Sequence, residues 1–206
     1  GWVTREDLAE YESGHEEPYT VDFMGFTVYG CGPWCQGPII LETLNILNGV
    51  DLKSMGHNSP EYLHTIIEAL NLSYSDRHVY QGDPRFIDVP MDELLDQAYG
   101  AKRRALIDPN KAFGEMPPAG TPEELGIARG GGVPIGDKAE GYKEMAVDTA
   151  YVCAVDKDGN TFSATPSDGQ HSSPIIPGLG FVPSNRGTQS WTDPNNPACL
   201  APGKRP

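Results

Sequence analysis

Hydrophobic residues in the first half of the chain recur at spacings that predict helices. Residues 39–47 are apolar almost all round, and Gly49 stands where a helix would end, so we expect a buried helix there. The clearest helix is predicted over 59–80, where Ser59 can cap the N-terminus and Pro60 suits the first helical position. The stripe that we expect this helix to bury consists of Leu63, Ile66, Ile67, Leu70 and Tyr74.

Shorter elements are predicted on either side of these two helices. Thr4 is a suitable cap for a short helix that runs through Tyr11, and a strand is expected at about 23–29. Another helix is predicted to begin at Pro90. Its first turn is acidic and its end is basic, which complements the helix dipole.

The pattern changes after the helices. Between 108 and 147 the periodicity gives way to Pro, Gly and charged residues, which predicts a long flexible linker. β structure is expected beyond it, as a hairpin over 149–167 and a short strand near 180–183. The chain is therefore predicted to divide into a helical part, 1–148, and a β-rich part, 149–206.

The predicted hairpin sets one hydroxyl residue opposite another. Residues 157–159 suit a three-residue loop, a type I turn whose glycine takes the left-handed conformation. Counting outward from this loop pairs Val155 with Thr161 and, further along, Thr149 with Ser167. A strand that begins at Thr149 thus has a second hydroxyl group beside it.

The position of Thr149 makes it a candidate nucleophile. A chain break between Asp148 and Thr149 would leave Thr149 as a new N-terminus on a rigid strand. A terminal amine has an ordinary pKa of about 7.7 to 8.0 and can accept the hydroxyl proton near neutral pH. Ser167 could orient the threonine Oγ. The competing interpretation is that Thr149 is only a good β-strand residue.

Composition excludes several functions. The net charge of −14 argues against nucleic acid or an anionic membrane surface as a partner. The histidines and the four cysteines lack the spacing of a metal site, so we expect no metal and no other cofactor. Cys31 and Cys35 could form a local disulfide or remain free thiols. No apolar run is long enough to cross a bilayer.

Two carboxylates in the stretch SDRHVYQGDP are expected to be structural. Asp76 and Asp83 are predicted to hold Arg77 and to cap local turns, rather than to act as an acid and base pair.

The chain starts without Met and stops in a loop-like segment, so we expect an internal piece of a longer protein.

Several stretches together resemble the γ-glutamyltransferase (gamma-glutamyltranspeptidase) family of N-terminal nucleophile hydrolases. They are TREDLAEYE, GCGPWCQGPIILETLNILNG, NSPEYLHTIIEAL, SDRHVYQGDPRFIDVP, DTAYVCAVDKDGNTFSAT, the PGLGF turn and APGKRP. The resemblance implies an α+β protein with the four-layer αββα fold, cut at Asp148/Thr149 into a large and a small subunit. It also puts Thr149 at the nucleophile position and Ser167 at the position of a neighbouring hydroxyl.

The resemblance leaves the substrate open. Gly169 stands where γ-glutamyl-specific members usually carry an asparagine. Those members also carry an aspartate that binds the α-amine of the substrate, and the nearest match to it in this sequence is Gln189. The oxyanion and carboxylate-binding segments are expected beyond Pro206. The expected function is hydrolysis or transfer of γ-glutamyl groups from compounds such as glutathione. A glutaryl or cephalosporin type of acylase and an inactive binding homologue are the alternatives.

The family resemblance also suggests the binding partners and the location of the protein. The partners would be a small amide substrate and the chain's own large and small subunits. A periplasmic or extracellular location is suggested by the resemblance alone.

Overall fold

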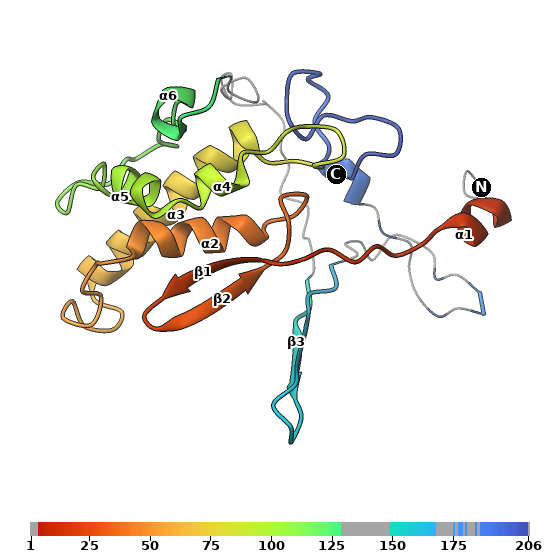
Figure 1. The fold of residues 1–206 in the computed structure, drawn as a ribbon, viewed down its shortest axis with the longest axis horizontal. Helices are drawn as coiled ribbons and strands as arrows, with labels where there is room; N and C mark the ends of the chain where they lie inside the picture. The colour runs from red at the N-terminus through yellow and green to blue at the C-terminus, as the bar shows by residue number, and fades with distance from the viewer. Residues whose placement is uncertain are drawn as a thin grey trace.

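In the computed structural model all the helices but the first form one body, and a β-hairpin projects from it (Figure 1). The structure describes residues 4–128, 149–167, 175, 177–178, 180, 184 and 186–205. The short helix α1 (Arg5–Glu10) lies away from the other helices, at the opposite end of the molecule. It begins as predicted, with a capping box between Thr4 and Asp7. The mixture of helices and strands fits the expected α+β class.

Helix α2 (Gly37–Leu47) is the central element of the body. It contacts α3 (Pro60–Tyr80), α5 (Gln97–Arg104) and the hairpin formed by β1 (Tyr19–Phe23) and β2 (Phe26–Gly30). Neighbours on several sides explain why this helix is apolar almost all round. The prediction of a buried helix is confirmed, since its buried apolar residues are Pro38, Ile39, Leu41, Ile46 and Leu47.

The single strand predicted at 23–29 was wrong, because the chain turns back in its middle. Strands β1 and β2 pair in antiparallel fashion, with Phe23 opposite Phe26. Met24 and Gly25 form the turn with φ of 51° and 84°. Two left-handed residues in a row match the type I′ hairpin turn. Gly25 was the signal for this turn, but the aromatic residues on both sides suggested one continuous strand.

Helix α3 begins where the sequence predicted, but it buries a different face. Ser59 caps the helix, and Pro60 is its first residue. Leu63 and Ile67, from the predicted stripe, are 43% and 52% exposed. The residues that are buried are Glu68, Ala69, Leu72, Ser73, Ser75, Asp76 and Tyr80. The buried face is rich in polar groups that find partners inside the body, which apolar periodicity cannot anticipate.

The uninterrupted helix predicted from Pro90 was also wrong. The structure has α4 (Met91–Leu94), then a break, then α5. Asp96 makes the break, because its carboxylate accepts hydrogen bonds from the backbone of Ala98 at 2.8 Å and Tyr99 at 3.0 Å. An aspartate inside a helical pattern therefore acts here as a new N-cap.

The first part of the predicted linker packs against the helices. Within it, α6 (Pro122–Leu125) starts at a capping box formed by Thr121 and Glu124. The backbone N–H of Phe113 donates to Glu68 of α3 at 2.9 Å. Residues 108–128 are thus tied to the body, while residues 129–147 lie outside the described residues.

A buried polar cluster joins α2, α3 and α5. The carboxylate of Asp76 accepts hydrogen bonds from the Tyr99 hydroxyl and the Gly120 N–H, both at 2.7 Å, and pairs with Arg103 at 3.1 Å. Burial and the negative charge of Asp76 raise the pKa of Glu42 well above its ordinary value. Glu42 is therefore protonated where an exposed glutamate would be charged.

Candidate functional site

The β3–β4 hairpin forms with the predicted register. Strand β3 (Val152–Val155) pairs antiparallel with β4 (Thr161–Ala164), and Val155 lies opposite Thr161. The loop closes at Asp156, whose backbone N–H donates to the Asn160 carbonyl at 3.0 Å. Gly159 has a φ of 84°, so it takes the left-handed position expected of a three-residue loop. The register prediction is confirmed over both strands.

The Asp156 side chain stiffens the tip of the hairpin. Its carboxylate accepts hydrogen bonds from the backbone N–H groups of Asp158 and Asn160, both at 2.9 Å. The side chain of Asn160 donates to it as well, at 2.8 Å. These hydrogen bonds, led by that of the Asn160 side chain, lower the pKa of Asp156. The loop thus sets the register through local contacts.

The ladder continues beyond the two strands toward Thr149. The N–H of Ala150 donates to the Pro166 carbonyl at 3.0 Å. Proline has no N–H to return to the Ala150 carbonyl, so this pair keeps one of its two possible hydrogen bonds, and the register continues past Pro166. Thr149 and Ser167 form the next pair, at a position without backbone hydrogen bonds, where facing side chains approach most closely.

The structure brings the Thr149 and Ser167 hydroxyl groups into contact. Their Oγ atoms lie 2.5 Å apart, and either can be the donor. Thr149 is exposed and Ser167 is half-buried. Because β-branching already limits the rotamers of Thr149, this hydrogen bond leaves its Oγ little freedom. The arrangement presents one oriented hydroxyl group to an incoming molecule, as a nucleophile requires.

The other predicted site residues are not joined to this pair in the same way. Asp148 and Gly169 lie outside the described residues. Gln189 is exposed in the short 3-10 helix η1 (Arg186–Gln189).

Cys31 and Cys35 are free thiols in the structure, which agrees with one of the two sequence interpretations. The Cys35 thiol donates to the Gly32 carbonyl at 3.4 Å and accepts from the Gly37 N–H at 3.4 Å. Burial raises its pKa, so the thiol form is favoured.

The partners predicted for Asp76 and Asp83 were wrong. Neither carboxylate holds Arg77. Asp76 pairs with Arg103, whereas Asp83 pairs with Arg85 and Arg205. The sequence could suggest Arg85, two residues from Asp83. The sequence contains no signal for the pairing of Asp83 with Arg205, because these two residues are 122 positions apart.

Among the described residues, no helix combines the length and the apolar character needed to cross a membrane. The same residues contain no group of three or more His, Cys, Asp or Glu side chains that could hold a metal ion.

The whole sequence, residues 1–206, matches the model of one protein family, gamma-glutamyltranspeptidase. The chain belongs to this family. Curated relatives of this chain carry two kinds of name. The acylase ACY 1 proenzyme of a Pseudomonas strain is 32% identical over 208 residues, which cover 100% of this chain and 33% of that protein. A glutathione hydrolase proenzyme from another Pseudomonas strain is 35% identical over 166 residues, covering 80% and 26%.

Solved structures similar to this chain show the same division. The cephalosporin acylase of Bacillus halodurans is 31% identical with a TM-score of 0.75, and the match covers 100% of this chain and 33% of that one. The gamma-glutamyltranspeptidase of Helicobacter pylori is 30% identical with a TM-score of 0.54, covering 57% and 35%. The chain spans about a third of the length of these relatives.

Proposed function

We propose that this chain carries the nucleophile of a self-processing amide hydrolase, and that the nucleophile is Thr149. The observation that carries the proposal is the contact between the Thr149 and Ser167 hydroxyl groups at the start of a rigid hairpin. Membership of a family whose relatives are named proenzymes supports it. In this proposal the hairpin lies between helical layers of a four-layer αββα fold.

The first step is cleavage of the chain itself. Thr149 Oγ attacks the carbonyl carbon of Asp148, and the nitrogen of Thr149 leaves as an amine, so that an ester replaces the peptide bond. Water then hydrolyses the ester and releases the Asp148 carboxylate together with the free Thr149 hydroxyl. Residues 1–148 become the end of a large subunit, and 149–206 become the start of a small one.

The second step is turnover of a substrate amide. The new α-amine of Thr149 accepts the hydroxyl proton while Oγ attacks the substrate carbonyl. The leaving amine takes the proton, and the acyl group remains on Oγ as an ester. Water or an amino acid then accepts the acyl group. Ser167 holds the Thr149 Oγ in place throughout, through the hydrogen bond that joins them.

The proposed substrates are γ-glutamyl compounds such as glutathione, in keeping with the glutathione hydrolase relatives. An acylase for glutaryl or cephalosporin side chains is the second candidate. The extent of the structural match favours this second candidate. The match to the acylase structure covers 100% of the chain with a TM-score of 0.75, whereas the match to the transpeptidase structure covers 57% with a TM-score of 0.54. Parallel hydrolysis assays with a γ-glutamyl anilide and a glutaryl anilide separate these two candidates.

Thr149→Ala in the full-length protein tests the mechanism. Because one atom serves both steps, mass spectrometry should find a single uncut chain, and turnover should fall by at least about a thousandfold. Ser167→Ala should still be cut but turn over about tenfold more slowly, as the loss of one orienting hydrogen bond predicts.

Thr161→Ala is the matched control, because it removes a threonine hydroxyl from the same hairpin opposite Val155. It should be cut and remain active. An active Thr149→Ala variant, or an uncut wild-type chain with full activity, would disprove the mechanism. A cut but inactive wild-type protein would favour the binding homologue.

A further inference from the structure

Asp83 is a completely buried carboxylate that binds two arginines, the nearby Arg85 and the distant Arg205. Arg85 donates to it from Nη2 at 2.6 Å and from Nε at 3.1 Å to each carboxylate oxygen. Arg205 donates from its backbone N–H at 3.0 Å and from its side chain at 3.0 Å. Asp83 thus fixes both the backbone and the side chain of Arg205.

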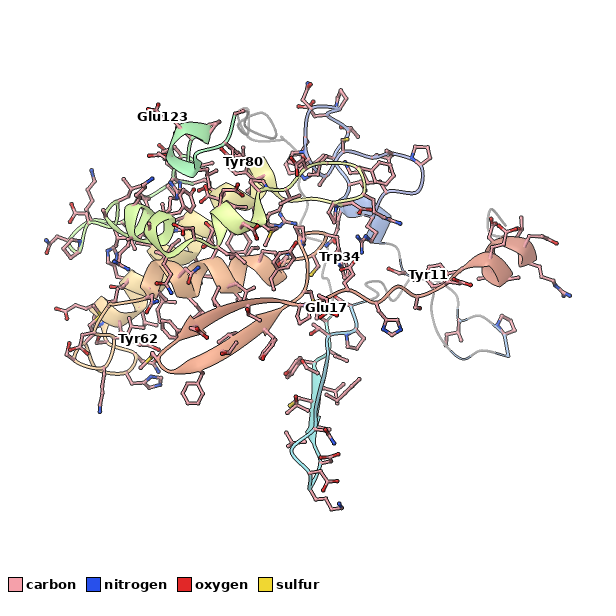
Figure 2. All side chains as sticks on the ribbon, viewed as in Figure 1. Tyr11, Glu17, Trp34, Tyr62, Tyr80 and Glu123 are labelled. Carbon is pink, nitrogen blue, oxygen red and sulfur yellow. The ribbon has the colours of Figure 1, made fainter. Side chains whose placement is uncertain are left out.

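Arg205 makes two further contacts with the first part of the chain. Its guanidinium lies 4.7 Å from the centre of the Trp34 ring. Its Nη1 pairs with Glu16 at 2.8 Å, and Glu16 in turn accepts the Trp34 indole N–H at 2.5 Å. Figure 2 shows Trp34 where the end of β2 meets the C-terminal segment. Arg205 is therefore surrounded by groups from separate loops.

The segment before Arg205 also lies against this region. The carbonyl of Pro197 approaches Gly82 so closely that a Cβ there would lie 2.6 Å from it. The Trp191 ring meets the His78 ring edge-on at 6.2 Å. Arg85 donates to the Gly203 carbonyl at 3.0 Å. Contacts at both ends and in the middle show that residues 191–205 are docked along their length.

Asp83 remains negatively charged in the folded protein. Burial would raise its pKa, but the hydrogen bonds from the side chains and backbone of Arg85 and Arg205 outweigh burial and hold the pKa far below the usual range. A folded-state pKa below the unfolded one contributes stability that is fully present above the unfolded pKa and is lost progressively as pH falls from the unfolded value to the folded one. The ion pairs therefore persist in mild acid.

We propose that the large subunit carries a docking surface for residues 191–205 of the small subunit. The docking surface consists of Glu16, Trp34, Gly82, Asp83 and Arg85. Docking is a property of the intact chain, while its role in holding two separate products together rests on the proposed cleavage before Thr149. Once the peptide bond is cut, residues 191–205 are no longer tethered through 148–149. Asp83 then becomes the anchor of a contact between two chains.

Hydrogen exchange of the full-length protein, followed by mass spectrometry, tests the docking surface. Arg205→Gln is the main variant, because its side chain is 28% exposed and can be changed with little disturbance of the core. Peptides within 191–205 should exchange at least about tenfold faster, since local opening governs exchange. Arg5→Gln, which removes an arginine from α1, a helix with no buried residue, is the matched control and should leave this exchange unchanged.

Asp83→Asn, with exposed Asp88→Asn as its control, provides the second pair of variants. Asp83→Asn should show the same local increase, while peptides of α3 keep wild-type exchange. Wild-type exchange over 191–205 in Arg205→Gln would overturn the docking surface, whether or not Asp83→Asn folds.

The same Arg205→Gln change in a Thr149→Ala background separates docking from cleavage. We expect the exchange increase in both forms and a several-fold larger one in the cut protein, where no covalent link limits the opening. Equal increases in the cut and uncut proteins would refute the role in holding the products together. A wild-type chain that is never cut would refute the proposed function and that role, and would leave docking to be judged by the exchange alone.

Discussion

The helical body and the β3–β4 hairpin are stabilised in different ways. In the body, Leu72 is completely buried, and Ile46, Leu47 and Ala69 pack with it. In the hairpin every residue of β3 is exposed, and Val155 is 69% exposed. The body depends on side chains from distant segments, whereas the hairpin depends on backbone pairing and on its own loop.

This difference explains where each region tolerates change. A side chain in the body is packed against neighbours that cannot move into the space it occupies, so truncating it leaves a cavity. A side chain in the hairpin mostly contacts solvent in this structure. The hairpin presents Thr149 and Ser167, while the body holds the segment that ends in Arg205. The next four predictions test this contrast, from the largest expected effect to the smallest.

Asp76→Asn should have the largest effect on the body. It leaves Arg103 charged and buried without its carboxylate partner, which costs about 3 to 5 kcal/mol in similar cases. Urea unfolding of the protein measures this loss. Asp22→Asn, at an exposed carboxylate of β1 that accepts only the Thr27 hydroxyl in the described residues, should cost less than about 1 kcal/mol. Equal losses would contradict a special role for the buried cluster.

A pair of truncations compares the two regions directly. Leu72→Ala should lower the free energy of unfolding by about 3 kcal/mol, because it removes buried methyl groups and leaves a cavity. Val155→Ala should change it by less than about 0.5 kcal/mol, since that side chain is largely in solvent. A large loss for Val155→Ala would mean that the hairpin is packed in the full-length protein.

Glu42→Gln should alter the pH dependence of stability. The folded state holds the Glu42 proton at pH values where the unfolded state releases it, so wild-type stability falls as pH rises above the ordinary glutamate range. Glutamine removes this loss. The variant should gain on the wild type by up to about 1.4 kcal/mol per pH unit over the affected range. Exposed Glu61→Gln controls for the loss of one negative charge. No gain with rising pH would show that Glu42 is charged when folded.

Gly159→Ala should have a small effect that is confined to the hairpin. Its φ of 84° is unfavourable for alanine, with a cost of about 1 kcal/mol. Hydrogen exchange should rise in peptides of 152–164 and stay constant in α2 and α3. Gly14→Ala, at an open position with an ordinary φ, is the control. Faster exchange throughout the body would contradict the independence of the two regions.

The sequence alone determined the features that rest on near neighbours. The hairpin register follows from a three-residue loop and a count along two strands, which is why Thr149 could be paired with Ser167 in advance. The start of α3 follows in the same way from Ser59 and Pro60. Such features need only residues within a few positions of one another.

Only the tertiary structure decided the features that join distant segments. The buried face of α3 depends on Arg103 and Tyr99, which satisfy Asp76, and no hydrophobic pattern records that partnership. The pairing of Asp83 with Arg205 depends on how the whole chain returns past α3. A buried charge is tolerated only where its partner is brought to it, and that is a property of the fold rather than of any short stretch of sequence.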